Sequence, residues 1–241
     1  MSRYPKIPVL VYHKIAEPSD YDANPNTCVT PSNFENQMKL LTLLGYRTAD
    51  PAEYLKARLG LPARLPEKPF LITFDDAFES AFTRALPILK KSGFSAVLFM
   101  VSSGFGRNAF WDGEDANSPN RLLKPDELKA LKDEGWCIGS HGVRHKNFAQ
   151  LDAPALAEEA AKSRTELELA LGSEVSWFAY PYGAYTPAAK RALAEAGYKI
   201  GFATEDGDGE IFAVPRRIIS GKSGFFNFAL RLRQAGKKSI L

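Results

Sequence analysis

Two pairs of polar residues in this sequence have the types and spacing to bind a metal ion and to catalyse hydrolysis. Asp75 and Asp76 form the first pair, His141 and His145 form the second, and each pair closely follows a short apolar run. Adjacent carboxylates repel each other, and a bound cation compensates for this repulsion. Two imidazoles four residues apart converge on one face of a helical turn, the spacing that a divalent ion needs.

Together these residues indicate a hydrolytic metal site. One carboxylate and two imidazoles provide three protein ligands, which leaves a position for water on a metal such as zinc. The second carboxylate is then available to take a proton from that water. Each pair also has a simpler explanation, namely an aspartate that caps a helix and two unrelated surface histidines. The chain has only three histidines in all, and two lie here, which favours the metal site.

A third polar and aromatic run is Tyr180-Pro181-Tyr182-Gly183, which follows another apolar segment. Proline and glycine fix a sharp turn that can direct a backbone N–H at a developing oxyanion. The aromatic and proline rings, Tyr180 and Pro181 among them, are candidates for the wall of a sugar-binding site. The same four residues are also an ordinary turn, so this run indicates a function only in combination with the other two.

The stretch 104–125 has no clear periodicity and is rich in aromatic residues. Long loops of this kind in compact domains often have a function. Trp111 and Asp112 are therefore candidates to line a substrate site, and packing of Trp111 against the rest of the domain is the alternative.

The elements that must position these residues alternate between short apolar runs and amphipathic segments, which predicts an α/β fold with largely parallel strands. Predicted strands comprise residues 8–12, 70–74, 95–101, 136–139, 175–179, 199–203 and 214–220. Predicted helices comprise residues 31–44, 79–91 with a kink or a break at Pro87, 126–134, 154–171 and 187–196. The carboxyl ends of parallel strands meet at one edge, where α/β enzymes place their reactive groups.

The length and charge of the chain restrict the remaining classes of function. With 241 residues and 45% hydrophobic residues, the chain is expected to form one domain over residues 1–241. A net charge of +3, with basic residues spread along the chain, does not indicate a nucleic-acid partner. Two cysteines do not form a disulfide framework. No apolar segment is long enough to span a membrane, and none resembles a signal peptide, so we expect a cytoplasmic protein.

Three motifs of the sequence resemble those of the polysaccharide deacetylases, carbohydrate esterase family 4, also called NodB-like proteins. In order along the chain, and each after a predicted strand, they are Asp75-Asp76, His141 with His145, and Tyr180-Pro181-Tyr182-Gly183. The resemblance extends from about Pro8 to about Ile219. It implies a single NodB homology domain folded as a deformed (β/α)7 barrel. It also implies an enzyme that removes an N-acetyl group from an amino sugar or glycan through metal-activated water and releases acetate.

The resemblance further implies roles for individual residues. Asp75 would be the general base, and Asp76, His141 and His145 would bind the divalent metal. Zinc is the metal expected, and cobalt or nickel would also suit these ligands. The backbone N–H of Tyr182 would help to hold the tetrahedral oxyanion.

Two departures from the family pattern concern the base and the general acid. The family's third motif begins with an arginine that orients the base, but Ala179 occupies this position, so Arg216 or Arg217 is a candidate substitute. The family's late histidine is also missing. The run Tyr12-His13 is similar to a subgroup with an N-terminal histidine, and we expect His13 to protonate the leaving amine. A structural histidine, hydrogen-bonded in the core, is the alternative.

Two other functions are compatible with the same residues. The metal site could hydrolyse a non-sugar amide or an O-acetyl ester, since a fold and a metal determine the reaction type better than the substrate. The chain could also be an inactive carbohydrate-binding homologue, as the missing arginine would allow. Release of acetate from an amino-sugar substrate distinguishes the enzyme from the binding protein.

Overall fold

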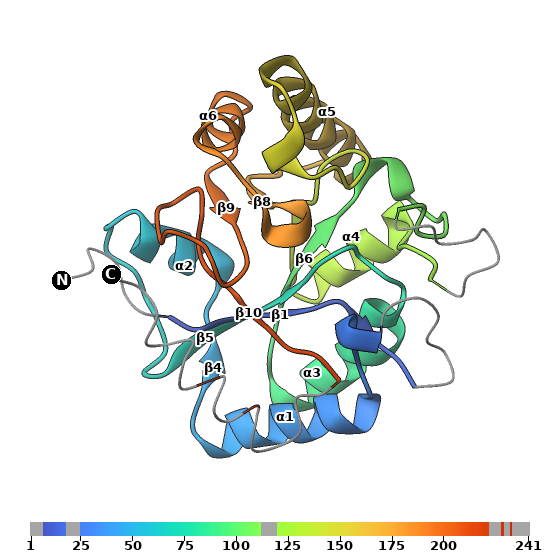
Figure 1. Ribbon diagram of the computed structural model, residues 1–241. Coiled ribbons are helices and arrows are strands. Elements are labelled where there is room, and N and C mark those ends of the chain that lie inside the picture. Colours follow the sequence, from blue (N-terminus) through green and yellow to red (C-terminus); the bar gives the residue numbers. More distant parts are fainter. Residues whose placement is uncertain (1–6, 18–24, 112–119, 222–227, 229–231, 233–241) are drawn as a thin grey trace.

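Parallel strands form the centre of the structure, and helices surround them (Figure 1). The computed structural model describes residues 7–17, 25–111 and 120–221, together with Phe228 and Leu232. In the main sheet the strand order is β10-β1-β5-β6-β7-β8-β9, and β4 pairs with β5 outside this path. These strands are β1 (Val9–Tyr12), β4 (Arg47–Thr48), β5 (Pro69–Phe74), β6 (Val97–Met100), β7 (Cys137–Ser140), β8 (Trp177–Ala179), β9 (Ile200–Phe202) and β10 (Arg217–Ile218).

The barrel is closed by the segment that leads into β10. Phe202 of β9 forms an isolated parallel bridge with Val214, and Arg217 of β10 then lies opposite Leu10 of β1. The segment therefore bonds first to one edge of the sheet and then to the other. This arrangement confirms the predicted deformed (β/α)7 barrel, and it brings Arg216 to the seam between the two edges.

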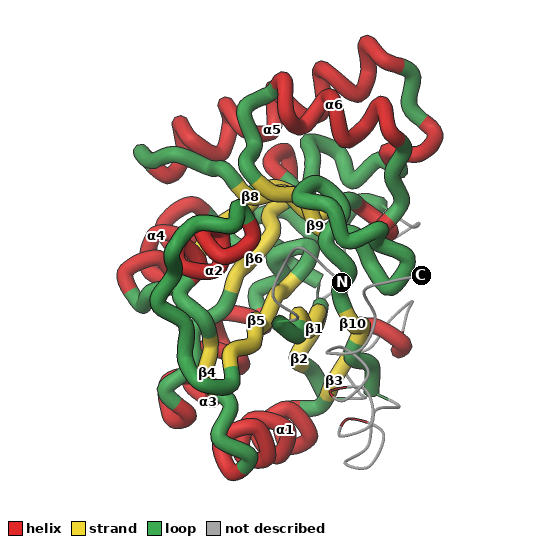
Figure 2. Tube along the Cα trace, turned by 90° about the vertical axis from the view of Figure 1, so that its left-hand side faces the viewer, coloured by secondary structure: helices red, strands yellow, loops and turns green. Residues whose placement is uncertain are grey.

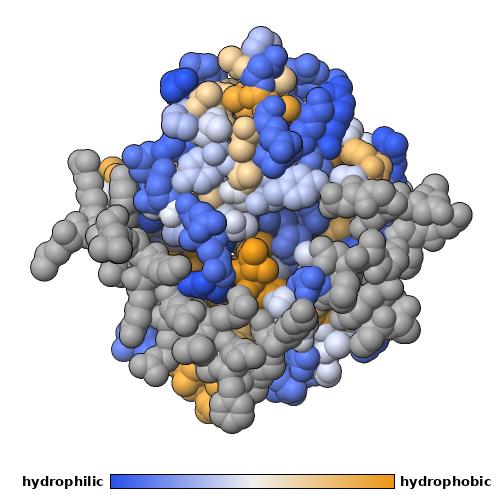
Figure 3. All heavy atoms as spheres, viewed as in Figure 1, coloured by the Kyte–Doolittle hydropathy of each residue, from blue (hydrophilic) through white to orange (hydrophobic). Residues whose placement is uncertain are grey.

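Side chains from alternate strand positions fill two separate apolar layers, as the pleat of a strand requires. Leu71 and Phe99 belong to the layer inside the barrel, which also contains Trp177 and Phe202. Phe70, by contrast, packs in the larger layer beneath the surrounding helices. Figure 2 shows β4, β5 and β6 side by side, with α1 at one end of the molecule. Figure 3 shows mostly hydrophilic residues on the described part of one face, with a small hydrophobic area near its centre.

The helices begin at strong local signals. In α1, α2, α5 and α6 a side chain accepts a hydrogen bond from a first-turn backbone N–H, and a proline lies in the first turn. The helices are α1 (Pro31–Leu43), α2 (Pro51–Arg58), α3 (Leu86–Ser92), α4 (Pro125–Asp133), α5 (Ala153–Leu171) and α6 (Pro187–Glu195). Five of them lie where the sequence predicts helix, but α2 has no predicted counterpart.

The predicted helix over 79–91 does not break at Pro87 but changes from π-helical to α-helical geometry one residue before it. The chain forms a π-helical turn over Ala81–Ala85, and α3 then begins at Leu86 with Pro87 in its first turn. The backbone N–H of Leu86 still bonds to the Ala81 carbonyl, so the helical segment is continuous, and the wider π-helical turn precedes the proline, which has no N–H to donate.

A second, smaller sheet lies outside the main one. A two-stranded parallel sheet pairs β2 (Lys14–Ile15) with β3 (Cys28–Val29), and neither strand is predicted. Within the described residues, no helix combines the length and the apolar character needed to cross a membrane. That all 241 residues belong to one domain stays a prediction.

Candidate active site

The aspartate pair lies directly after β5, where the chain turns sharply. Asp76 and Ala77 both have left-handed backbone conformations, with φ of 71° and 61°. Such conformations cost non-glycine residues about 1–3 kcal/mol each and persist where the surrounding structure holds them. The turn separates the two carboxylates, so that Asp75 contacts a guanidinium and Asp76 contacts two imidazoles.

Arg216 holds the carboxylate of Asp75 through two parallel bonds. Its Nη1 lies 2.6 Å from Oδ1 and its Nη2 lies 2.7 Å from Oδ2. The guanidinium is fully buried and also donates to the Thr73 hydroxyl at 3.1 Å and the Ala203 carbonyl at 3.0 Å. Its central carbon lies 5.4 Å from the ring centre of Phe99. Of the two arginines expected to replace the one missing at position 179, the structure brings Arg216 to Asp75.

The environment of Asp75 favours its charged form. Burial raises the pKa of this carboxyl. The positive charge of Arg216, with contributions from His141 and His13, lowers the pKa by more than burial raises it. The net result is a pKa below the ordinary value of an aspartate. Each carboxylate oxygen keeps a second acceptor direction, because a carboxylate has about four lone-pair sites and Arg216 uses two.

Asp76, His141 and His145 form a buried group whose ligand atoms all lie within 4.8 Å of one another. Asp76 Oδ1 is 3.5 Å from His141 Nε2 and 3.2 Å from His145 Nε2. Atoms bound tetrahedrally at about 2.0–2.1 Å to one ion lie about 3.3 Å apart, so these separations suit a shared metal. Asp76 Oδ1 is also buried without a well-oriented hydrogen-bond donor, an arrangement that a cation would compensate.

A backbone contact orients one of the two imidazoles. His141 Nδ1 lies 2.7 Å from the carbonyl oxygen of Ala179, to which it donates, because a carbonyl can only accept. The lone pair of Nε2 then faces Asp76 and is available to a metal. Burial, followed by the charges of His145 and Arg216, lowers the pKa of His141 to about 4 against the opposing effect of the aspartates. His141 is therefore neutral at pH 7, the form that binds metals.

The two imidazoles converge through a loop, so the expected helical turn is wrong. Residues 141–147 contain no helix, and His145 has a left-handed φ of 54°. A helical turn would place all four intervening peptides in one hydrogen-bonded spiral. Here other parts of the protein bind the backbone of Gly142, Val143 and Arg144 instead, and they hold the two rings 5.0 Å apart at their centres.

Two aromatic rings pack against the second imidazole. The indole of Trp111 stacks on His145 with ring centres 4.4 Å apart and planes 17° from parallel. The ring of Tyr182 meets His145 edge-on at 4.7 Å. Tyr182 itself has a left-handed φ of 60° within the short 3-10 helix Pro181–Gly183, which turns its peptide sharply after β8.

One cavity of about 290 Å³ joins most of the predicted site residues. Its wall includes His13, Asp75, Asp76, Trp111, His141, His145 and Tyr182. His13 is partly exposed, and its buried Nδ1 has no hydrogen-bond partner among the described residues. A histidine anchored in the core through that atom is therefore not what the structure shows.

Other predicted contacts are absent from this wall. Tyr180 is fully buried, packs against Phe148, and donates its hydroxyl to the Phe212 carbonyl at 2.9 Å. Pro181 is buried as well, and neither residue lines the cavity. The structure thus places both in the packing of the domain, and their expected role in substrate binding stays a prediction. Asp112 lies outside the described residues.

Several residues of the cavity were not predicted from the sequence. Asn26, Thr27 and Thr204 contribute to its wall, although they lie far from the three polar runs. Asn26 and Thr27 belong to a short 3-10 helix, Pro25–Thr27, and Thr204 follows β9. Only the position of Thr204 after a strand could have indicated it.

Comparisons with known proteins agree with this geometry. Residues 63–201 match the family model for polysaccharide deacetylase. The putative polysaccharide deacetylase YxkH of Bacillus subtilis is 29% identical over 224 residues, which cover 91% of this chain and 74% of that protein. A Staphylococcus aureus poly-beta-1,6-N-acetyl-D-glucosamine N-deacetylase is 26% identical over 81% of this chain and 69% of its own length.

A solved structure shares the fold as well. The Streptococcus pyogenes deacetylase PplD in complex with acetate superposes with a TM-score of 0.78 and 26% identity, covering 94% of this chain and 97% of that one. The subgroup expected from Tyr12-His13 stays a prediction. Because the family model spans more than half of the sequence and the fold and metal-ligand group agree with it, the chain belongs to the polysaccharide deacetylase family.

Proposed function

We propose that this protein is a zinc-dependent deacetylase that removes the N-acetyl group from amino-sugar units of a glycan and releases acetate. One observation carries the proposal: the buried group of Asp76, His141 and His145 shares a cavity with Asp75, which Arg216 holds ionised. The names of the relatives support the substrate class, since one acts on an N-acetylglucosamine polymer and another was solved with acetate.

The ligand set supports zinc among the divalent metals. Two imidazoles and one carboxylate are a common donor set of catalytic zinc sites, with the remaining position open. When bound there, the ion supplies a polarised acetyl carbonyl and a water of lowered pKa. Cobalt and nickel would suit the same ligands.

The remaining residues provide proton transfer and orientation. Asp75 takes a proton from the attacking water through the acceptor directions that Arg216 leaves open. Its low pKa makes it a weak base, which suits a water that is itself acidified. The backbone N–H of Tyr182, after the turn that follows β8, donates to the oxyanion of the tetrahedral intermediate.

His13 supports an amide as the bond that is cleaved. An amine leaves from a tetrahedral intermediate only after it gains a proton, whereas many ester oxygens leave more readily. His13 lies in the cavity wall with Asp75 and the metal-ligand group, as a donor to the leaving nitrogen requires. The O-acetyl ester and the non-sugar amide are outcomes of the assay below.

The proposal is tested by metal content and acetate release in parallel. Purified wild type is expected to contain about one equivalent of zinc and to release acetate from N-acetylglucosamine oligosaccharides faster than from O-acetylated ones. The His141→Ala/His145→Ala double variant should lose both the zinc and the activity. Lys39→Ala, at an exposed residue of α1, serves as the control and should keep both. Wild type that stays metal-free and inactive with added zinc, cobalt or nickel would contradict the proposal and favour a carbohydrate-binding protein.

A further inference from the structure

The loop between the two histidines is fastened through its backbone on both sides. The carbonyl of Gly142 accepts from the backbone N–H of Ser102 at 3.0 Å. The carbonyl of Val143 accepts from the backbone N–H of Ser103 at 3.2 Å and from its hydroxyl at 2.6 Å. These contacts hold the acceptor groups of the loop against the end of β6.

The donor groups of the same loop converge on a single carboxylate. Glu159 Oε2 accepts from the backbone N–H of Val143 at 2.7 Å and from that of Arg144 at 3.2 Å. The other oxygen, Oε1, lies 3.3 Å from Arg144 Nη1 and 4.0 Å from Lys146 Nζ. A charged acceptor forms stronger hydrogen bonds with backbone N–H groups than a neutral one.

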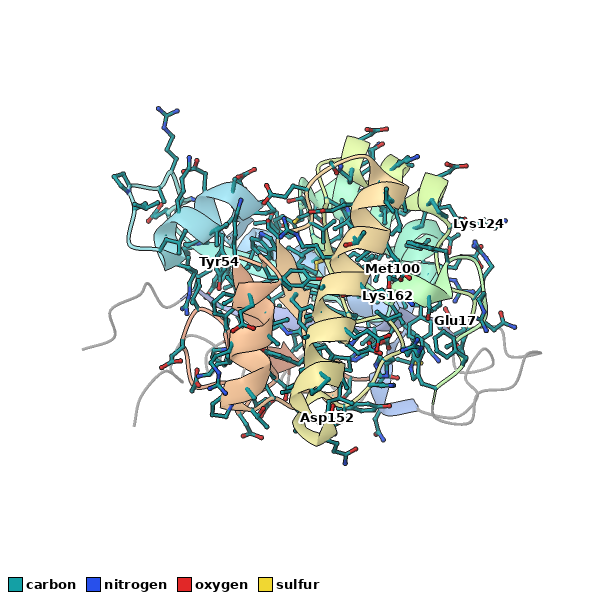
Figure 4. All side chains as sticks on the ribbon, turned by 90° about the horizontal axis from the view of Figure 1, so that it is seen from above. Glu17, Tyr54, Met100, Lys124, Asp152 and Lys162 are labelled. Carbon is teal, nitrogen blue, oxygen red and sulfur yellow. The ribbon has the colours of Figure 1, made fainter. Side chains whose placement is uncertain are left out.

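Glu159 comes from a different element and is unusually buried for its type. It lies on α5, the long helix that begins after Asp152 and runs past Lys162 beside α6 (Figure 4). Only 1% of its side chain is exposed, whereas the side chain of its neighbour Glu158 is 57% exposed. Glutamate is rarely fully buried unless its charge is compensated, and here the compensating donors are those of the histidine loop.

The loop needs such support because its own conformation is not regular. It contains no helix, and His145 has a left-handed backbone, which a peptide segment does not keep without external contacts. If the loop changed its conformation, the Nε2 atoms of His141 and His145 would no longer both lie close to Asp76 Oδ1.

We propose that Glu159 is a positioning residue that presets the histidine loop for metal binding, without touching the metal or the substrate. The inference rests on the proposed metal site. A preset loop does not have to be ordered when the ion binds, so the carboxylate raises metal affinity. Loss of outer contacts of this kind typically weakens metal binding about 10- to 100-fold.

The test compares two adjacent glutamates on one helix. Zinc affinity is measured by competition with a chelator for wild type, Glu159→Gln and the matched control Glu158→Gln. We expect a dissociation constant about 10- to 100-fold higher for Glu159→Gln and an unchanged one for Glu158→Gln. At saturating zinc, the kcat of Glu159→Gln should approach that of the wild type, because the reacting groups are intact. A folded Glu159→Gln protein with wild-type zinc affinity would overturn the inference and leave the proposed function standing.

A measurement on the unmodified protein covers the case in which Glu159→Gln does not fold. In metal-free wild type, the backbone N–H groups of Val143 and Arg144 are expected to exchange with deuterium slowly, because Glu159 already binds them. Exchange at the rate of an exposed amide would overturn the inference. A wild type with no zinc affinity at all would overturn the proposed function, and this inference with it.

Discussion

Arg216 and Arg217 are adjacent in the sequence but have different partners in the structure. Arg216 is fully buried and holds both oxygens of Asp75, whereas Arg217 pairs with Glu205 at 2.7 Å. Successive side chains of an extended segment point to opposite faces, so only one of the two can enter the barrel. A guanidinium matches a carboxylate with two parallel bonds, which an ammonium group cannot do.

Arg216→Lys is therefore expected to impair catalysis without removing the metal. The lysine keeps the positive charge but loses the two-bond contact that orients Asp75, and a small displacement of a reacting group lowers turnover by roughly 100-fold. We expect kcat for acetate release to fall by about 10- to 100-fold with zinc content unchanged. Arg217→Lys is the matched control and should behave like wild type. Turnover of Arg216→Lys at the wild-type rate would contradict the orienting role.

His13 can be assigned by varying the leaving group. His13→Ala should lower turnover of an N-acetyl sugar by about 100- to 10,000-fold, the usual contribution of a general acid. The same variant should hydrolyse an activated aryl acetate nearly as fast as wild type, because a phenolate leaves without gaining a proton. Kinetics on both substrates, with zinc content measured in parallel, check this. An equal loss on both substrates would contradict the general-acid role.

At the scale of elements, the turn after β8 forms one side of the cavity. Gly183 has a left-handed φ of 68°, and a Cβ there would collide with the side chain of Thr204, which also lines the cavity. Gly93, at the end of α3, has nearly the same φ of 67° but has nothing within 4 Å of such a Cβ. Comparing alanine substitutions at the two glycines therefore separates the energetic cost of the left-handed backbone from that of the steric clash with Thr204.

Gly183→Ala is expected to be more destabilising than Gly93→Ala. Backbone strain alone costs an alanine about 1–2 kcal/mol in the left-handed region, and this is the full effect expected at Gly93. At Gly183 the collision adds to the strain and displaces Tyr182, so kcat should fall as well. Urea unfolding and acetate-release kinetics on both variants measure the two effects. Equal destabilisation of the two variants, with activity unchanged in both, would contradict this expectation and show that the Thr204 side chain moves away from the added methyl group at no measurable cost in free energy.

At the scale of the whole molecule, folding buries titratable groups in the barrel mouth. His141 is 1% exposed, and its pKa falls from 6.5 to about 4 when the chain folds. Between these values the unfolded chain binds more protons than the folded one, so the free energy of unfolding rises with pH. Asp75 affects the free energy of unfolding at lower pH. Its pKa is depressed in the folded protein, so the stability it contributes is lost only as the pH falls below the ordinary aspartate range.

The metal-free protein should therefore lose stability as the pH is lowered from about 6.5 to about 4. Each unit of pKa difference corresponds to about 1.4 kcal/mol, so a loss of a few kcal/mol is expected. Urea unfolding at pH 7, 5.5 and 4 measures it, and His141→Gln should show a smaller slope over the same range. A wild-type stability that is constant across this interval would contradict the account.

Local signals in the sequence are sufficient to predict most of the elements and the candidate metal ligands. The caps at Thr30 and Thr186 mark helices because a cap and its helix are neighbours in the chain. The same kind of signal was present at Asp50-Pro51, but the weak apolar pattern of residues 51–58 did not indicate α2. Asp76 and His141 were predictable because parallel strands bring their ends to one edge.

The residues that support the site are selected by long-range packing. Arg216 and Asp75 are 141 residues apart, and nothing local distinguishes Arg216 from Arg217 until the seam of the barrel turns one of them inward. Glu159 likewise has the same local setting as Glu158, and the packing of α5 on the histidine loop separates them. The candidate reactive residues and most of the strands that carry them were predictable from the sequence, since both depend on short-range pattern. The orientation of the reactive residues depends on long-range packing and on left-handed turns at non-glycine residues, which are uncommon and which no sequence pattern marked here.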